Sequence, residues 1–418
     1  MGACLSNSEM CIEQHQTSTN ASDYCDEADI NINSFKLGSY LGVGGSGVVK
    51  TATKISGRNF GRVYALKSLS KSYLLRKQHG PDSAMNELKI LVTIAEQSPP
   101  ADIKELVQEN FIANVHYAFQ DDYHLYFVLD HASNGDMRHN LGKYCSFDEN
   151  TVQFFAAQIF MALNTCHNAN ILHRDVKPEN VLLTRNGYIK LTDFGVSKIL
   201  SNVDRCFSTS GTHGYMAPEV YLAGYGHFHG KTADYFSAGV MLYECLLGKR
   251  PFCIDHFKSI RSLGAAPGID LTVLWKSKHV SIHCKQFISH LLMVHHTHRP
   301  LNFLQIKSHP WFLSTSFDWS AVVKGTMRSP IVTGKDVAKL DVGSRNVQLA
   351  LMKHKSLHQK IFEDNEQNKF KNFKYPVDSS SLTLECNWVE CKDKNLSNST
   401  ITTMFSPLPT STSSNRQV

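Results

Sequence analysis

Hydrophobic positions divide the chain into a strand-rich part and a helix-rich part. Over residues 35–130 apolar residues alternate or run together in short stretches such as Tyr123–Leu129, which is typical of β-strands. One helix is predicted among these strands, over Ser83–Ala95. Over residues 131–312 longer segments carry apolar residues at helical spacing, as in Phe147–Asn168. The pattern predicts an α+β fold with a small β-rich lobe, one main helix in that lobe, and a larger helical lobe.

Polar segments lie on both sides of this predicted domain. Residues 1–34 are rich in Ser, Asn, Asp, Glu and Thr and are expected to lack a packed core. Residues 313–375 form a tail, and residues 376–418 are a Ser/Thr/Asn-rich stretch that is expected to be disordered. The predicted domain therefore covers residues 35–312.

Composition narrows the class of protein. The 42% hydrophobic and 19% charged residues are ordinary for a globular protein, and no apolar run approaches the roughly 20 residues that span a bilayer. A net charge of +6 without a dense Lys/Arg cluster does not indicate a nucleic-acid partner. The 11 cysteines are scattered and odd in number, which indicates reduced thiols. With no signal-peptide pattern, we expect a cytoplasmic location.

Five short motifs follow one another along the chain. They are the glycine loop Gly42–Val49, then Tyr64–Lys67, His173–Asn180, Asp193–Gly195 and Ala217–Glu219. A glycine loop of this spacing also occurs in dinucleotide-binding folds, between a strand and a helix. Here a second strand follows the loop, which indicates a β-hairpin, and the alternating β/α pattern of a dehydrogenase is absent.

In this order and at these separations, the motifs resemble those of the eukaryotic protein kinases, from about Phe35 to Phe312. The resemblance implies the bilobal protein kinase fold, with ATP and Mg²⁺ as cofactors and a protein substrate. Lys177-Pro178-Glu179-Asn180 is the form found in kinases that act on serine or threonine.

The resemblance also implies a role for each motif residue. Asp175 is the implied catalytic base, Lys177 reaches the γ-phosphate, and Lys67 binds the α/β-phosphates while pairing with Glu87. The implied Mg²⁺ ligands are Asn180 and Asp193. The implied nucleotide site consists of Leu41, Gly42, Val43, Gly44, Gly45, Ser46, Gly47, Val48, Val49, Ala65, Lys67, Asp130, Ala132, Asp136, Glu179, Asn180, Leu182 and Asp193.

Two structural roles and one alternative complete this interpretation. Glu219 is expected to form a buried ion pair with Arg299, and Asp234 to brace the catalytic loop. The alternative is a pseudokinase, a scaffold that keeps the fold without turnover. Pseudokinases usually lose the residues equivalent to Lys67, Asp175 or Asp193, and all three are present here. Ser46 stands where many kinases of this type carry an aromatic residue.

Several strings resemble the AGC group of kinases, namely Leu191–Lys198, Ser210–Glu219 and Phe317–Val322. Gly135–Leu141 and His173 favour the YANK-like kinases within it, with the mitogen- and stress-activated and ribosomal S6 kinases as competitors. The group implies an upstream kinase that phosphorylates the activation segment, the stretch from Asp193 to Glu219. Ser208 occupies the expected position there, with Thr209 as the second candidate. Extra sequence between Ala95 and Phe111 is expected to form a surface insertion.

Two further features bear on regulation and substrate choice. Phe370–Tyr375 has the shape of an AGC hydrophobic motif that docks on the small lobe, although an ordinary aromatic pair is an equal alternative. Asp136, Glu179 and Glu244 fall where basophilic relatives keep acidic residues, so we predict Arg or Lys a few residues before the acceptor.

The N-terminus Met1–Ser6 fits an N-myristoylation signal at Gly2, and Cys4 is the expected palmitoylation site. One myristoyl chain binds a membrane only marginally, so the second acyl group is needed for stable attachment. We expect a peripheral protein on the inner face of the plasma membrane; the alternative is a coincidental Met-Gly start.

Overall fold

The structure is a computed structural model of the 418-residue chain. It describes residues 30–44, 47–96, 110–200, 205–223, 227–252, 268–331, 348, 351–352 and 364–375. Gly2, Cys4, Gly45, Ser46, most of the extra sequence before Phe111 and residues 376–418 lie outside this part. The chain divides into two units, Met1–Pro376 and Val377–Val418, and all described residues belong to the first.

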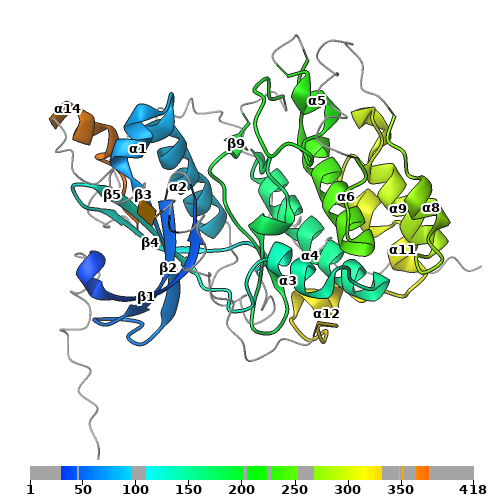
Figure 1. Ribbon diagram of the computed structural model, residues 1–418, viewed down its shortest axis with the longest axis horizontal. Helices are drawn as coiled ribbons and strands as arrows, with labels where there is room; N and C mark the ends of the chain where they lie inside the picture. The colour runs from blue at the N-terminus through cyan, green and yellow to red at the C-terminus, as the bar shows by residue number, and fades with distance from the viewer. Residues whose placement is uncertain are drawn as a thin grey trace, which may run out of the picture. The chain divides into compact units, whose positions relative to one another are not determined.

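The small lobe is built on one antiparallel sheet of five strands in the order β1-β2-β3-β5-β4. Figure 1 shows this sheet with the helices α1 and α2 beside it. The elements are β1 (Phe35–Val43), β2 (Gly47–Lys54), β3 (Val63–Ser70), α1 (Lys71–Arg76), α2 (Gly80–Glu96), β4 (Val115–Gln120) and β5 (His124–Asp130), preceded by the 3₁₀ helix η2 (Ile32–Ser34).

The glycine loop connects two paired strands, as the sequence predicts. Val43 of β1 pairs with Val48 of β2 in an antiparallel register, so the loop is the turn of a hairpin. At Gly47 a Cβ would lie 2.2 Å from the Ser68 carbonyl oxygen of β3, so only glycine allows the two strands to approach this closely.

Helix α2 corresponds to the helix predicted over residues 83–95 and is slightly longer. It buries an apolar face that includes Ala84, Leu88 and Leu91. Glu87 lies on this same face and is also buried, which requires a charged partner.

The large lobe is mainly helical, and α4 and α6 pack together within it (Figure 1). Its helices are α3 (Met137–Tyr144), α4 (Glu149–Asn168), α5 (Pro218–Tyr221), α6 (Lys231–Leu247), α8 (Thr272–Lys276), α9 (Ile282–Leu291), α10 (Phe303–Lys307), α11 (Pro310–Leu313) and α12 (Trp319–Val323). Short elements are β6 (Ile171–Leu172), η3 (Pro178–Asn180), β7 (Val181–Leu183), β8 (Ile189–Leu191), β9 (Lys198–Ile199) and η5 (His296–His298).

Local sequence sets the ends of the two central helices. The Asp148 side chain accepts a hydrogen bond from the Thr151 N–H, so α4 begins at Glu149 and not at Phe147. Helix α6 ends before Gly248, whose φ of 69° is the left-handed conformation that glycine adopts readily.

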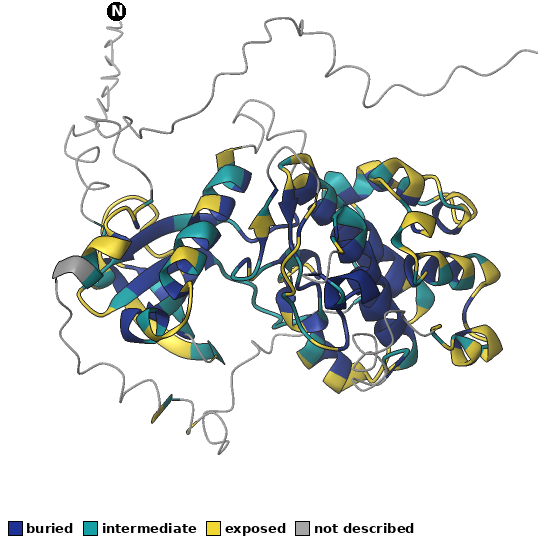
Figure 2. Cartoon of the chain, turned by 90° about the horizontal axis from the view of Figure 1, so that it is seen from above, coloured by how far each residue is buried: buried dark blue, intermediate teal, exposed yellow. Residues whose placement is uncertain are grey.

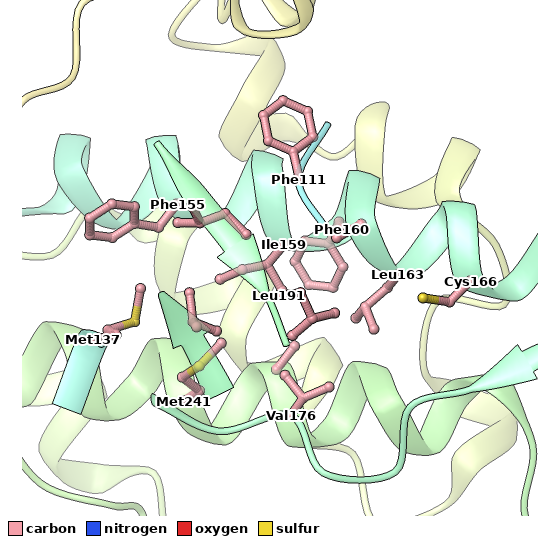
Figure 3. Packing of buried hydrophobic residues seen from close by; sticks show 14 of the residues in the cluster. Phe111, Met137, Phe155, Ile159, Phe160, Leu163, Cys166, Val176, Leu191 and Met241 are labelled. Carbon is pink, nitrogen blue, oxygen red and sulfur yellow. The ribbon is translucent and has the colours of Figure 1, made fainter. Parts of the chain in front are cut away.

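The core of the large lobe also anchors its loops. In Figure 2 the central helices are largely buried, whereas the peripheral helices carry exposed residues. Figure 3 shows Val176 and Leu191 within a cluster that includes Phe155, Ile159 and Met241. Because Val176 follows Asp175 and Leu191 lies two residues before Asp193, burial of these apolar neighbours fixes the backbone that carries both acidic residues.

The end of the described chain packs on the small lobe. It forms α14 (Asp364–Gln367) and η6 (Asn368–Phe370), after which Tyr375 and Ala118 of the edge strand β4 exchange backbone hydrogen bonds of 2.9 and 2.7 Å. Phe370 and Phe373 are 0% and 1% exposed. Of the two alternatives for this segment, the structure shows docking on the small lobe.

Candidate active site

Lys67 is placed by β3 between two carboxylates. Its Nζ lies 2.7 Å from Glu87 Oε1 on α2 and 3.1 Å from Asp193 Oδ1 after β8. Burial alone lowers the pKa of the Lys67 ammonium, but Asp193 and Glu87 together outweigh burial and raise it. The lysine is therefore charged at physiological pH and links the small lobe to the loop after β8.

Asp193 is held in an uncommon backbone conformation. Its φ is 65°, in the left-handed region, which costs a non-glycine residue about 1 kcal/mol or more. The nearby Lys67 ammonium lowers the pKa of the Asp193 carboxyl, and its side chain is 48% exposed. The result is an accessible carboxylate that stays ionised.

Asp175 lies at the centre of a second hydrogen-bonded group. Its Oδ2 accepts bonds from Lys177 Nζ at 2.6 Å and Asn180 Nδ2 at 3.0 Å. Its Oδ1 accepts a bond from Thr212 Oγ1 at 2.6 Å, and Lys177 Nζ also donates to Thr212. The backbone carbonyl of Asn180 accepts a 2.9 Å bond from the Thr192 N–H, next to Asp193, so the two groups are adjacent.

Asp234 braces the loop that carries Asp175, as predicted. Its Oδ2 accepts the His173 N–H at 3.0 Å and its Oδ1 accepts the Arg174 N–H at 2.8 Å. Arg174 has a left-handed φ of 65°, so these bonds hold a conformation that is otherwise unfavourable. His167 on α4 also bonds to Asp234, at 2.8 Å.

The other described residues of the implied nucleotide site lie on elements of both lobes. Leu41, Gly42 and Val43 are in β1, with Gly44 directly after it, and Gly47, Val48 and Val49 are in β2; Ala65 is in β3, Ala132 precedes α3, Glu179 is in η3 and Leu182 is in β7. Asp130 ends β5, where its side chain bonds to His116 and Asn114. The side chain of Asp130 is thus engaged within the protein.

The segment around Ser208 contacts the loop that carries Asp175, through Arg174. Arg174 Nη1 lies 2.7 Å from Oγ of the exposed Ser208, whereas Thr209 donates to the Ala223 carbonyl at 3.2 Å. Cys206 lies beside Arg174, at 3.5 Å. Burial raises the pKa of the Cys206 thiol, but hydrogen bonds with His229 and Ser208 outweigh it and lower the pKa to about 6.

The predicted ion pair at the end of this segment is present. Arg299 Nη1 and Nη2 bond to the two oxygens of Glu219 at 2.6 and 2.9 Å, and both residues are buried. This two-pronged contact fixes α5 against the region after α9.

The acidic residues expected to select substrates lie close together, but with an unforeseen neighbour. Asp136 caps α3 by accepting the His139 N–H at 2.7 Å. Glu179 and Glu244 both bind Arg138, which the sequence analysis did not single out. Thr212 was likewise not predicted, although its hydroxyl shortly before Ala217–Glu219 was a signal for it.

No group of three or more His, Cys, Asp or Glu side chains among the described residues is arranged to hold a metal ion. Among the same residues, no helix is long and apolar enough to cross a membrane.

Comparison with known sequences decides the family. The sequence profile of the protein kinase domain matches residues 35–312. The chain belongs to the protein kinase family. A probable serine/threonine-protein kinase of Dictyostelium discoideum is 33% identical to it over 306 residues, 72% of this chain and 61% of that protein.

Further relatives of this kinase chain are ribosomal S6 kinases. Ribosomal protein S6 kinase alpha-4 of Mus musculus is 32% identical over 330 residues, 76% of this chain and 40% of the relative. Ribosomal protein S6 kinase alpha-2 of Homo sapiens is 33% identical over 309 residues, 71% of this chain and 38% of the relative. The chain thus spans about 40% to 60% of the length of these relatives. They support the AGC relationship, and the YANK-like affinity stays a prediction.

Proposed function

We propose that this chain is an active serine/threonine protein kinase that transfers the γ-phosphoryl group of ATP to a protein hydroxyl. The observation that carries this proposal is the assembly of Lys67, Glu87 and Asp193 beside the group of Asp175 and Lys177. A relative named as a probable serine/threonine-protein kinase and another named as a ribosomal protein S6 kinase support the same activity.

The donor set fits Mg²⁺. Both N–H donors of the Asn180 amide are directed at Asp175, to its carbonyl at 2.8 Å and to its Oδ2 at 3.0 Å, so the amide oxygen is the group left to face a cation. Asp193 adds an ionised carboxylate, and hard oxygen ligands are those that Mg²⁺ prefers. When bound, the metal would neutralise charge on the phosphate oxygens.

Asp175 is positioned to take the proton of the substrate hydroxyl. A carboxylate offers about four lone-pair positions. Lys177 and Asn180 use those of Oδ2, and Thr212 uses one of Oδ1. The incoming hydroxyl therefore donates to the remaining position on Oδ1. As the new O–P bond forms, the bond to the β-phosphate oxygen breaks, the proton passes to Asp175, and ADP leaves.

Regulation through Ser208 is part of the proposal. The exposed Ser208 hydroxyl lies 2.7 Å from the Arg174 guanidinium. A phosphate added to Ser208 by an upstream kinase would therefore form an ion pair with Arg174. Thr209 is the weaker candidate because its hydroxyl already donates to Ala223.

The proposal extends to the choice of substrate and to attachment to a membrane. Asp136 places an acidic group at the start of α3, which supports selection of a basic residue before the acceptor, whereas Glu179 and Glu244 are paired with Arg138. Attachment through Gly2 and Cys4 rests on sequence alone and is tested by fractionating cells that express Gly2→Ala.

The test is transfer of radiolabelled phosphate to a degenerate peptide library. Asp193→Asn should lower kcat by about a hundredfold or more, because it removes an ionised group that contacts the phosphate–metal assembly. Asp82→Asn makes the same charge change at a side chain that is 84% exposed and should leave kcat unaltered. Nucleotide binding without any transfer by the wild-type protein would instead indicate a pseudokinase.

A further inference from the structure

Arg138 occupies part of the surface expected to select basic substrates. It is the second residue of α3, which begins at Met137 directly after the capping residue Asp136. Its Nε lies 2.8 Å from Glu179 Oε1, while Nη1 and Nη2 lie 2.9 and 3.1 Å from the two oxygens of Glu244. One internal guanidinium thus bridges two of the three acidic residues.

The contact has the geometry of strong arginine–carboxylate recognition. The Glu244 pair is bidentate, with two parallel N–H···O bonds, and such pairs are stronger and more directional than single ones. The Tyr215 hydroxyl bonds to both Arg138 and Glu244 and closes the group from a third side.

Burial makes this arrangement hard to displace. The Glu244 side chain is 8% exposed, against 38% for Arg138 and 43% for Glu179. Leaving a buried carboxylate without its cation is costly, so Arg138 keeps Glu244 paired before any substrate arrives. A substrate arginine would need the same lone pairs and would have to displace a group that is tethered to the protein.

We propose that Arg138 is a specificity-determining residue that occupies the Glu179–Glu244 pair and closes it to arginine side chains of the substrate. The proposal rests on the kinase activity proposed above and refines its substrate class. The kinase then selects basic residues through Asp136 alone, and a second basic residue directed at the Glu179–Glu244 pair gives no advantage.

The experiment compares peptides that differ at one position. Each peptide has an acceptor serine in an Ala/Gly background, with one arginine moved through the five positions before the serine. For each protein variant we take the ratio of kcat/KM with and without that arginine, so that overall changes in activity cancel. The variants are wild type, Arg138→Ala, Glu179→Gln, Arg138→Ala/Glu179→Gln and Arg250→Ala.

Arg250→Ala is the matched control because it removes the same charge close by. Its guanidinium lies over the Tyr215 ring at 5.6 Å. We expect Arg138→Ala to raise the arginine ratio at one position by about tenfold or more, since one charge-assisted pair becomes available to the peptide. Adding Glu179→Gln should remove most of this gain, and Arg250→Ala should match wild type.

Other results would overturn the proposal. One is a wild-type enzyme that already selects arginine strongly at a position where Glu179→Gln alone abolishes the selection. Another is an Arg138→Ala protein with a wild-type ratio at every position. If Arg138→Ala does not fold, Arg138→Lys replaces it. This variant keeps the positive charge but cannot form the bidentate pair with Glu244. An arginine ratio equal to that of wild type in this variant would then contradict the proposal. Absence of turnover on every peptide would refute the kinase activity itself and is distinct from these outcomes.

Discussion

Docking of the C-terminal tail on the small lobe gives a prediction that can be worked out in detail. Phe373 is 1% exposed and meets the Phe127 ring of β5 edge to face, with centroids 4.9 Å apart. Phe370 is 0% exposed and lies 5.4 Å from the Lys71 ammonium, and its carbonyl accepts a 2.7 Å bond from Gln120. We expect Phe373→Ala to release this segment.

The size of the effect follows from how the segment is attached. Truncating a buried phenylalanine to alanine costs about 3–5 kcal/mol when the surroundings cannot adjust. Here the tail can leave its site, so the loss cannot exceed the free energy of docking, and a second truncation at Phe370 should add little. A loss of about 3 kcal/mol corresponds to roughly a hundredfold more frequent opening.

Amide hydrogen exchange measures this opening. The Ala118 and Tyr375 N–H groups bond to each other's carbonyls, so both should exchange about a hundredfold faster in Phe373→Ala and equally fast in the double variant. Lys371→Ala alters the exposed neighbour of Phe370 and serves as the control. Unchanged exchange in Phe373→Ala, or the same acceleration in Lys371→Ala, would refute the reasoning.

Three further outcomes are expected. Ser208→Ala/Thr209→Ala should lower activity on a peptide by about tenfold because a charge-assisted bond is lost, whereas full activity would show that loop phosphorylation is dispensable. Burial raises the pKa of Asp130, but a hydrogen bond with His116 and the nearby Lys190 ammonium outweigh burial and lower the pKa from 3.8 to about 2. The group therefore stabilises the fold above pH 3.8 by about 2 kcal/mol. Asp130→Asn should lower the urea midpoint at pH 7, with the difference vanishing as pH falls towards 2. Glu219→Ala should cost about 3–5 kcal/mol in thermal unfolding, since it leaves Arg299 buried without its partner, and a wild-type melting temperature would contradict this.

The sequence predicted those features that depend on local pattern or on residues close in the chain. The helical period placed α2 and α4 within a few residues of their observed bounds, because an apolar face of that length is compatible only with a helix. The hairpin around the glycine loop followed from the strand on either side of it.

The sequence did not reveal contacts between distant positions. Arg138 lies 41 residues from Glu179 and 106 from Glu244, and no periodicity links such separations. Thr212 bonds to Asp175 across 37 residues. A motif gives the residue types of a site, but the partners that complete their hydrogen bonds are determined by tertiary packing, which pattern analysis does not contain.

Contacts between distant positions also hold helix α2. Glu87 on this helix pairs with Lys67, and the helix is itself held by bonds to another part of the chain. Ser83 donates to the Gly195 carbonyl at 2.7 Å and Asn86 to the Ser197 carbonyl at 2.9 Å. These bonds join α2 to the chain directly after Asp193, and η6 of the docked tail contacts the same helix. We therefore expect that a change in either the segment after Asp193 or the tail shifts Glu87 and weakens its contact with Lys67.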